Sequence, residues 1–249
     1  MKKIKKHWKI FTVGLLILII SVLAGLYFFI RLNTYSAMPE ATDLLSLETV
    51  HREDSWIRVE PDSFTNSIVL YQGGLVEEEA YLPLAVKLSE EGYRVFLPSM
   101  PFNLAILNLS IFEDIYNDYE EEGEWWISGH SLGGASASIF AAGNTELLDG
   151  IIFLASYPSG NSDLSDTNVP VLSITGSDDE ILNRTRYEEA SENLPEHTVN
   201  EVIEGGNHSN FGYYGFQSGD GTGSISRESQ HTELARLISE FIKENSPKE

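Results

Sequence analysis

The residues best suited to chemistry form a Gly-x-Ser-x-Gly pattern, Gly129-His130-Ser131-Leu132-Gly133. A short apolar run precedes the pattern, and a stretch rich in small residues follows it. A serine hydroxyl is a useful nucleophile only when a turn holds it clear of the backbone, beside a base and near amides that stabilise an oxyanion. Glycines flanking Ser131 leave room for such a turn between a strand and a helix. The pattern therefore predicts a nucleophilic serine, and the alternative is a Gly-Ser turn without chemistry.

A serine nucleophile needs a histidine base, and His208 is the candidate that its position favours. It follows the predicted strand 198–203 in a glycine-rich loop. His197 precedes the same strand and would lie at the opposite edge of the sheet. His231 opens the last predicted helix, where a surface cap is the simpler interpretation. His130 adjoins the nucleophile but points elsewhere on the turn, so we interpret it as structural.

The base needs a carboxylate to orient it, and two aspartates compete for this role. Asp178 and Asp179 both follow the predicted strand 171–175. We prefer Asp179, because the acid in a Ser-Asp-His order usually ends a Gly-x-x-Asp sequence after the strand. One of the two aspartates would cap the helix that follows, since Asp is a preferred N-cap residue.

Two backbone amides are needed to stabilise the oxyanion. One belongs to Leu132, the residue after the nucleophile, and the other should come from the loop after strand 67–71. Gly73 and Gly74 let that loop approach closely, so we expect Gly74 or Leu75 to be the donor. On their own, these glycines indicate only a tight turn. A phosphate-binding loop is disfavoured because the lysine and the glycine spacing of that motif are missing.

The elements that must position these residues alternate along the chain. Short apolar strands followed by amphipathic helices predict an α/β fold, with a mostly parallel central sheet and helices on both faces. Ligands of such sheets bind beyond the carboxyl ends of the strands, where the candidate residues fall. No second domain, internal repeat or large lid insertion is evident. The predicted strands are 55–59, 67–71, 93–97, 125–128, 150–154, 171–175 and 198–203, and the predicted helices are 79–91, 104–122, 134–142, 183–193 and one around 234–241.

A separate segment precedes these elements. Residues 10–30 form an uncharged apolar stretch that would span about 30 Å as a helix, roughly one hydrocarbon core. Because lysines precede it, we expect a cytoplasmic basic segment 1–9, a transmembrane signal anchor 10–30, a tether 31–54 and an extracytoplasmic domain 55–249. The chain would then be a single-pass cell-membrane protein that contacts the bilayer through residues 10–30. The competing interpretation, a cleaved signal peptide, normally has a shorter apolar core and a clearer cleavage site.

Composition excludes several classes of function. The formal charge of the chain is −22. All 38 acidic residues and 10 of the 16 basic residues lie beyond residue 31, so residues 32–249 carry a formal charge of −28. Such a charge repels nucleic acids and anionic lipids. Solubility is the simplest role for the acidity, and selection of a cationic substrate is an alternative. The chain has no cysteine, so disulfides and thiolate metal sites are impossible.

Several stretches together resemble a known family. Gly129–Gly134 with Asp179 and His208 look like the alpha/beta-hydrolase superfamily. Within this superfamily, the chain resembles the small group called fold-5. The stretches that match this group are 71–76, 100–105, 205–208, 219–221 and 225–228. It covers about residues 55–245 and leaves the membrane segment outside. One departure is Gln72, where many members of the superfamily have His or Pro.

The resemblance implies an enzyme that uses Ser131, His208 and Asp179 without metal or cofactor. We expect a small-molecule carboxylic ester as substrate, bound by apolar side chains. The alternatives are acyl transfer or thioester or amide hydrolysis at the same site, or a tethered binding module without activity. The expected pocket residues are Met100, Phe102, Tyr157 and Phe211.

Overall fold

The computed structural model describes residues 2–119 and 123–246, which form two units divided between Thr34 and Tyr35. The first unit is the helix α1 (Lys2–Asn33). Within the described residues, α1 contains one segment, Phe11–Asn33, that is long and apolar enough to span a bilayer, with a mean hydropathy of 2.8. Membrane anchors and signal sequences share this property.

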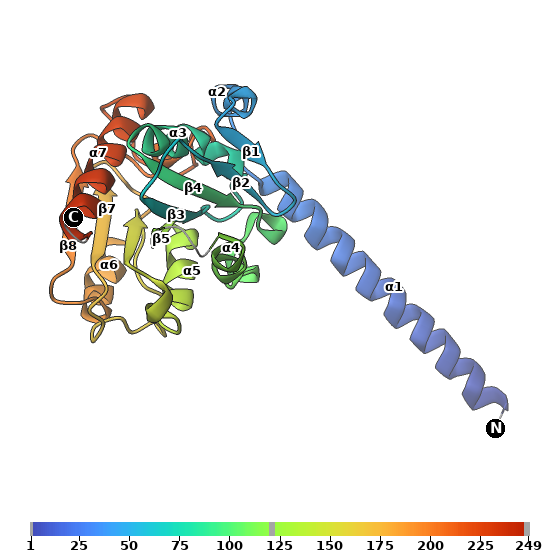
Figure 1. Ribbon diagram of the computed structural model, residues 1–249. Coiled ribbons are helices and arrows are strands. Elements are labelled where there is room, and N and C mark those ends of the chain that lie inside the picture. The colour runs from blue at the N-terminus through green and yellow to red at the C-terminus, as the bar shows by residue number, and fades with distance from the viewer. Residues whose placement is uncertain (1, 120–122, 247–249) are drawn as a thin grey trace. The chain divides into compact units, whose positions relative to one another are not determined.

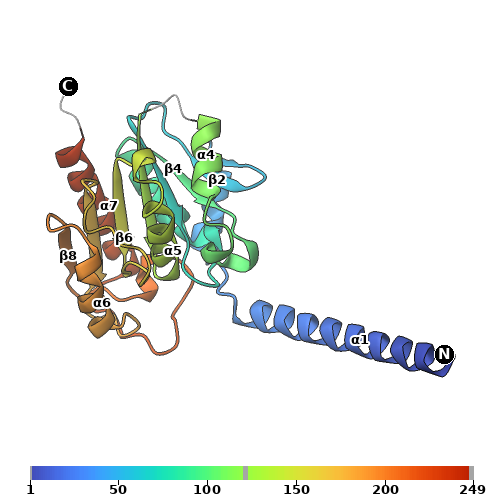
Figure 2. The same cartoon turned by 90° about the horizontal axis from the view of Figure 1, so that it is seen from below.

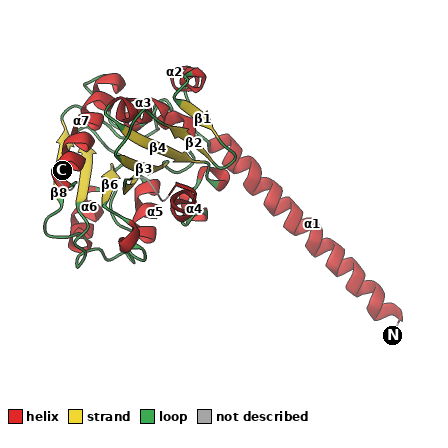
Figure 3. Ribbon diagram, in the orientation of Figure 1, coloured by secondary structure: helices red, strands yellow, loops and turns green. Residues whose placement is uncertain are grey.

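An eight-stranded sheet forms the centre of the second unit, in the order β1-β2-β4-β3-β5-β6-β7-β8 (Figures 1 and 3). Strand β2 runs antiparallel to both of its neighbours, and every other pair is parallel. The mostly parallel sheet predicted from the sequence is therefore confirmed. The strands are β1 (Val50–Arg52), β2 (Trp56–Val59), β3 (Asn66–Tyr71), β4 (Tyr93–Pro98), β5 (Glu124–His130), β6 (Gly150–Leu154), β7 (Val171–Gly176) and β8 (Val199–Ile203).

Helices cover both faces of the sheet (Figures 1 and 2). On β3, Ile68 and Leu70 belong to the core beneath α3 and α7, and Val69 and Tyr71 to the core beneath α4 and α5. Because successive strand residues point to opposite faces, a strand covered on both sides is a continuous apolar run. The helices are α2 (Pro39–Thr42), α3 (Leu82–Glu90), α4 (Ile111–Tyr119), α5 (Leu132–Ala141), α6 (Arg184–Ala190) and α7 (Arg227–Asn245). Short 3-10 turns are η1 (Asp43–Ser46), η2 (Glu78–Tyr81), η3 (Pro101–Asn103), η4 (Ala105–Leu107), η5 (Thr145–Leu147), η6 (Ser191–Asn193) and η7 (Ser209–Phe211).

Most of the expected tether 31–54 is structured, because residues 31–33 belong to α1 and the second unit begins at Tyr35, 20 residues before position 55. The amide of Tyr35 donates to the carbonyl oxygen of Leu75 at 2.7 Å. Ala41 is fully buried, and Val50 pairs with Val59 as part of β1. These apolar residues are too widely spaced to produce a helix or strand pattern, because each is buried by partners distant in sequence.

The predicted helix 104–122 is shorter than expected, since α4 begins only at Ile111. Before it, Asn103 adopts a left-handed φ of 55°, and its carbonyl oxygen accepts a hydrogen bond from the amide of Leu75 at 2.8 Å. Residues 101–107 therefore follow the carboxyl edge of the sheet as two 3-10 turns. The predicted end of the helix, 120–122, lies outside the described residues.

Candidate active site

Ser131 stands at the sharp turn between β5 and α5. Its φ of 52° and ψ of −121° lie in a region that non-glycine residues seldom occupy, which indicates a backbone held by its surroundings. The flanking glycines are required by contact. A Cβ on Gly129 would lie 2.4 Å from the carbonyl carbon of Gly133, and one on Gly133 would lie 2.3 Å from the carbonyl oxygen of Tyr71. The strand–turn–helix context expected for a nucleophile is present.

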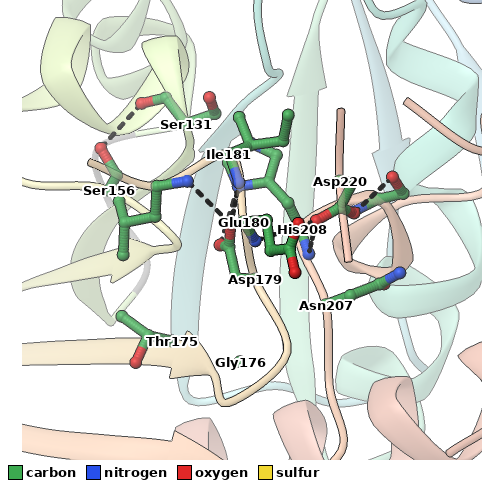
Figure 4. A network of polar contacts seen from close by, with 12 residues as sticks. Ser131, Ser156, Thr175, Gly176, Asp179, Glu180, Ile181, Asn207, His208 and Asp220 are labelled. Atoms are coloured by element: carbon green, nitrogen blue, oxygen red, sulfur yellow. Dashed lines mark hydrogen bonds and ion pairs between the residues drawn. The ribbon is translucent and has the colours of Figure 1, made fainter. Parts of the chain in front are cut away.

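Strand β6 and the residues after it hold the turn in place. The amide of Ser131 donates to the carbonyl oxygen of Leu154 at 3.0 Å. The Ser156 hydroxyl donates to the carbonyl oxygen of Ser131 at 2.7 Å (Figure 4). Gly134 fits this arrangement, because a Cβ there would lie 2.4 Å from the Ser156 hydroxyl oxygen. Ser156 has no sequence signal of its own, since its role depends on the pairing of β5 with β6.

His208 and Asp179 form a buried pair in the loops after β8 and β7. Nδ1 of His208 lies 2.9 Å from Oδ2 of Asp179 (Figure 4). The other oxygen, Oδ1, accepts from the amides of Ile181 and Leu182 at 2.9 and 2.8 Å. A carboxylate held in this way accepts a hydrogen bond from Nδ1. The ring proton is then on Nδ1 and the lone pair is on Nε2. Nε2 is buried and has no hydrogen-bond partner among the described residues.

The neighbouring Asp178 has other partners. Its carboxylate accepts from the amide and the hydroxyl of Ser224, both at 3.2 Å, and from the hydroxyl of Ser177 at 3.1 Å. Neither aspartate is the N-cap of α6, because Asn183 takes that position and accepts from the amide of Arg186. The geometry thus distinguishes the two candidates, and Asp179 is the one that contacts the histidine.

The interpretation of His231 as a surface cap is wrong. The residue is fully buried within α7, and Ser226 caps that helix instead. The His231 ring lies edge-on to Tyr213 with their centroids 4.9 Å apart. Burial lowers the pKa of His231 to about 3, so the residue is neutral at ordinary pH.

His130 is also buried and neutral, and it belongs to a short polar chain. The amide of Gly73 donates to the Tyr81 hydroxyl at 2.8 Å, and that hydroxyl lies 2.8 Å from Nδ1 of His130. The Tyr81 oxygen accepts from Gly73, and the tautomer of His130 decides whether Tyr81 or Nδ1 is the donor in the second bond. Burial holds the pKa of His130 well below its usual value, with a smaller contribution from His208, whose ring centroid is 4.6 Å away. Tyr81 lies in a predicted helix, where its hydroxyl gives no sequence signal.

The two candidate oxyanion donors from the β3 loop differ in their contacts. The amide of Leu75 is occupied, since it donates to Asn103. Gly74 lies against the residue that follows the nucleophile, because a Cβ at Gly74 would be 3.0 Å from the Leu132 side chain. The bond made by Leu75 therefore favours Gly74.

Ser131 and His208 line one cavity of about 260 Å³ at the carboxyl edge of the sheet. Of the four expected pocket residues, Tyr157 is part of its lining. The described residues that form its wall do not include Met100, Phe102 or Phe211. Met100 and Phe211 are buried in the protein interior, whereas Phe102 is exposed. The lining is Ser131, Leu132, Ala135, Ala155, Ser156, Tyr157, Ile181, Leu182, Asn183 and His208.

Asp220 is a buried carboxylate that the sequence interpretation did not assign. It accepts from the amide and hydroxyl of Ser209 at 2.7 and 2.6 Å and from the amide of Gly221 at 2.9 Å. A longer contact, 3.4 Å, joins it to the amide of His208. Asp220 thus fixes the loop that carries the histidine. Its only sequence signal is its place between two glycines, Gly219 and Gly221.

The described part of the chain contains no group of three or more His, Asp or Glu side chains placed to hold a metal ion. The expectation of a site without metal or cofactor stays a prediction.

Comparisons with known proteins place this geometry in context. A model of the alpha/beta hydrolase family matches residues 67–232. No curated protein matches the sequence. Similar solved structures include the dienelactone hydrolase of Anabaena variabilis, with 16% identity, a TM-score of 0.61 and coverage of 79% of this chain and 99% of that one. The monoacylglycerol lipase of Paleococcus ferrophilus has 15% identity, a TM-score of 0.57 and coverage of 79% and 99%. Est1E of Butyrivibrio proteoclasticus has 14% identity, a TM-score of 0.52 and coverage of 78% and 98%.

At these identities the structures agree in fold alone. The family match spans well over half of the chain, from β3 to α7, and includes the Ser131 turn and the His208 loop. This chain belongs to the alpha/beta hydrolase family.

Proposed function

We propose that this protein is a membrane-anchored serine hydrolase that cleaves carboxylic esters, with Ser131 as nucleophile. The observation that carries the proposal is the shared cavity. Ser131, held in a strained turn, and His208, oriented by a buried carboxylate, both line it. A mere structural turn would need neither an oriented imidazole nor an accessible serine.

In the proposed reaction, Oγ of Ser131 attacks the ester carbonyl carbon while Nε2 of His208 takes the hydroxyl proton. Collapse of the tetrahedral intermediate breaks the bond to the alcohol, which receives that proton from the imidazolium. Asp179 holds the ring orientation and stabilises its positive charge. Water, activated by the same histidine, then attacks the acyl-enzyme and releases the acid. As the acid leaves, His208 returns to Oγ of Ser131 the proton that it took from water, which restores the starting state.

The oxyanion would accept hydrogen bonds from the backbone amides of Leu132 and Gly74. Leu132 is the first residue of α5, so its amide is one of those that lack an acceptor within the helix. We choose Gly74 over Leu75 because the Leu75 amide already donates to Asn103.

The acyl group would occupy the cavity beside Ser131. Its wall contains apolar side chains of Ala135, Tyr157, Ile181 and Leu182. A wall with few charges suits an acyl chain better than a charged group. The proposed substrates are therefore carboxylic esters with an apolar acyl group.

We further propose that α1 anchors the domain outside the cytoplasm. Its apolar segment Phe11–Asn33 follows a run of lysines, and positive residues flanking such segments favour the cytoplasmic side.

The test is hydrolysis of a series of p-nitrophenyl esters of rising chain length by the full chain in detergent micelles. We expect Ser131→Ala to lower kcat by at least about 10⁴-fold, as loss of a triad member does. Ser165→Ala is the control, because Ser165 is a half-buried serine that bonds to Asp163 and is not part of the cavity lining. Equal rates for Ser131→Ala and the unaltered chain would refute the proposal. Product analysis with a competing alcohol separates hydrolysis from acyl transfer.

A further inference from the structure

Exposed large apolar side chains lie at the carboxyl edge of the sheet, the edge at which the cavity also lies. They follow β4, β5 and β8, although the domain is strongly acidic. Soluble proteins seldom expose such side chains in neighbouring loops without a partner. The residues are Phe102, Ile106, Leu107, Leu132 and Phe216, with exposed fractions of 53, 41, 54, 36 and 58%. We call this set the apolar rim.

Backbone contacts join the first loops of the rim. The carbonyl oxygen of Asn103, next to Phe102, accepts from the amide of Leu75. Gly74, in the same loop as Leu75, lies against the Leu132 side chain. The η4 turn, which carries Ile106 and Leu107, packs on α5. These loops are therefore neighbours at the carboxyl edge of the sheet, and Leu132 belongs both to the rim and to the lining of the cavity.

The chain enters the domain through the same edge. The amide of Tyr35 donates to Leu75 at 2.7 Å, and its carbonyl oxygen accepts from Glu77 at 3.1 Å. Three residues later, the amide of Met38 donates to the carbonyl oxygen of Tyr213 at 2.7 Å, in the loop that continues to Phe216. The entering segment 35–38 thus connects the loop after β3 to the loop after β8.

Chain length then limits where the bilayer surface can be. The apolar segment of α1 ends at Asn33, and Tyr35 is already fixed within the domain. Two residues of extended chain cover at most about 7 Å. If the segment spans a bilayer, the edge that holds Tyr35 must lie close to the membrane surface.

We propose that the apolar rim rests in the bilayer interface, and that the cavity takes lipid-like esters directly from the membrane. The substrate part of this proposal rests on the proposed ester hydrolysis. The charge of −28 beyond residue 31 disfavours anionic headgroups, so the rim fits a neutral, zwitterionic surface. We choose a lipid surface over a protein as the partner of the rim. The apolar segment of α1 ends two residues before Tyr35, which is bonded at this edge of the sheet.

The absence of cysteine allows a direct test of contact with the bilayer. Single-cysteine variants Leu107→Cys and Phe216→Cys of the full chain are labelled with an environment-sensitive nitrobenzoxadiazole dye. They are then reconstituted into phosphatidylcholine vesicles that contain a spin-labelled lipid as quencher. The control is Leu47→Cys, an exposed leucine that borders Gly92 at the amino edge of the sheet.

We expect blue-shifted emission and quenching at Leu107→Cys and Phe216→Cys, because interfacial side chains enter about 5–10 Å into the headgroup and acyl boundary. The dye at Leu47→Cys should show neither effect. Equal quenching at all three positions would overturn the proposal. Shielding that persists in detergent without lipid quenching would also overturn it, since a second copy of the chain would then cover the rim.

A second measurement separates this proposal from the proposed function. In vesicles, the double variant Ile106→Ser with Leu107→Ser should hydrolyse a long-chain ester held in the bilayer about tenfold more slowly, as expected for loss of apolar burial. Its hydrolysis of water-soluble p-nitrophenyl acetate should be unchanged, and Leu47→Ser should alter neither rate. Equal loss on both esters would contradict delivery from the membrane. If the unaltered chain cleaves neither ester while the dyes are still quenched, the proposed function fails together with the ester uptake that rests on it, and the membrane contact of the rim stands.

Discussion

Replacing Asp179 by asparagine would test how the histidine is oriented. The asparagine carbonyl oxygen can still accept from the amides of Ile181 and Leu182, now at 2.9 and 2.8 Å, so the loop should keep its conformation. The amide nitrogen would then face Nδ1 of His208 across 2.9 Å. Two donors cannot bond to each other, so the imidazole would shift its proton to Nε2 and lose the ability to accept from Ser131.

The expected loss in kcat for Asp179→Asn is about 10⁴-fold, or about 5.5 kcal/mol of transition-state stabilisation. The assay is the initial rate of p-nitrophenyl acetate hydrolysis, with thermal unfolding measured beside it. Asp178→Asn is the matched control, because the same chemical change falls on a carboxylate that bonds to Ser224. The control should retain activity within a few-fold. The reasoning is refuted if both variants lose activity equally, or if Asp179→Asn retains most of it.

Three other variants test the surroundings of the site. Tyr81→Phe leaves the buried amide of Gly73 without its acceptor, at a cost of about 1–3 kcal/mol in stability. Because this loosens the loop that carries Gly74, the variant should have a lower kcat and nearly the same KM. A change in KM alone would contradict this. His231→Phe should flatten the dependence of stability on pH. The pKa of His231 is about 3 in the folded chain and about 6.5 when unfolded, so stability is fully present above pH 6.5 and falls by about 1.4 kcal/mol per pH unit below it. Urea unfolding at pH 7, 6 and 5 measures that slope, and an unchanged slope in the variant would count against the buried neutral form. Gly133→Ala should abolish ester hydrolysis and lower the unfolding temperature, since its Cβ would lie 2.3 Å from a backbone oxygen; a stable, active variant would contradict that contact.

The sheet and the turn that bears Ser131 were predictable because local sequence determines them. Buried parallel strands are continuous apolar runs, as in β3 and β6, and short loops end each run at one edge of the sheet. His208 and Asp179 follow from that order. The structure brings the two together at the distance that the prediction requires.

Other features depend on contacts between distant residues and could not be predicted. The amide of Tyr35 bonds to the carbonyl oxygen of Leu75. The short polar stretch around Tyr35 has no periodic pattern from which this bond could be predicted. His231 is buried because its helix packs against the loop of Tyr213, whereas sequence alone places it at an exposed helix start. Phe211 was an expected pocket residue, but its ring stacks on His130, with centroids 5.4 Å apart. Aromatic residues near a site are equally suited to packing and to binding.

The central claim, that Ser131 is an activated nucleophile, is tested most directly by labelling with a fluorophosphonate probe and mapping the modified residue by mass spectrometry. The account predicts one adduct, on Ser131, which is lost in Ser131→Ala and retained in Ser165→Ala. Absence of labelling on the folded full chain, or an adduct on another serine that persists in Ser131→Ala, would contradict it.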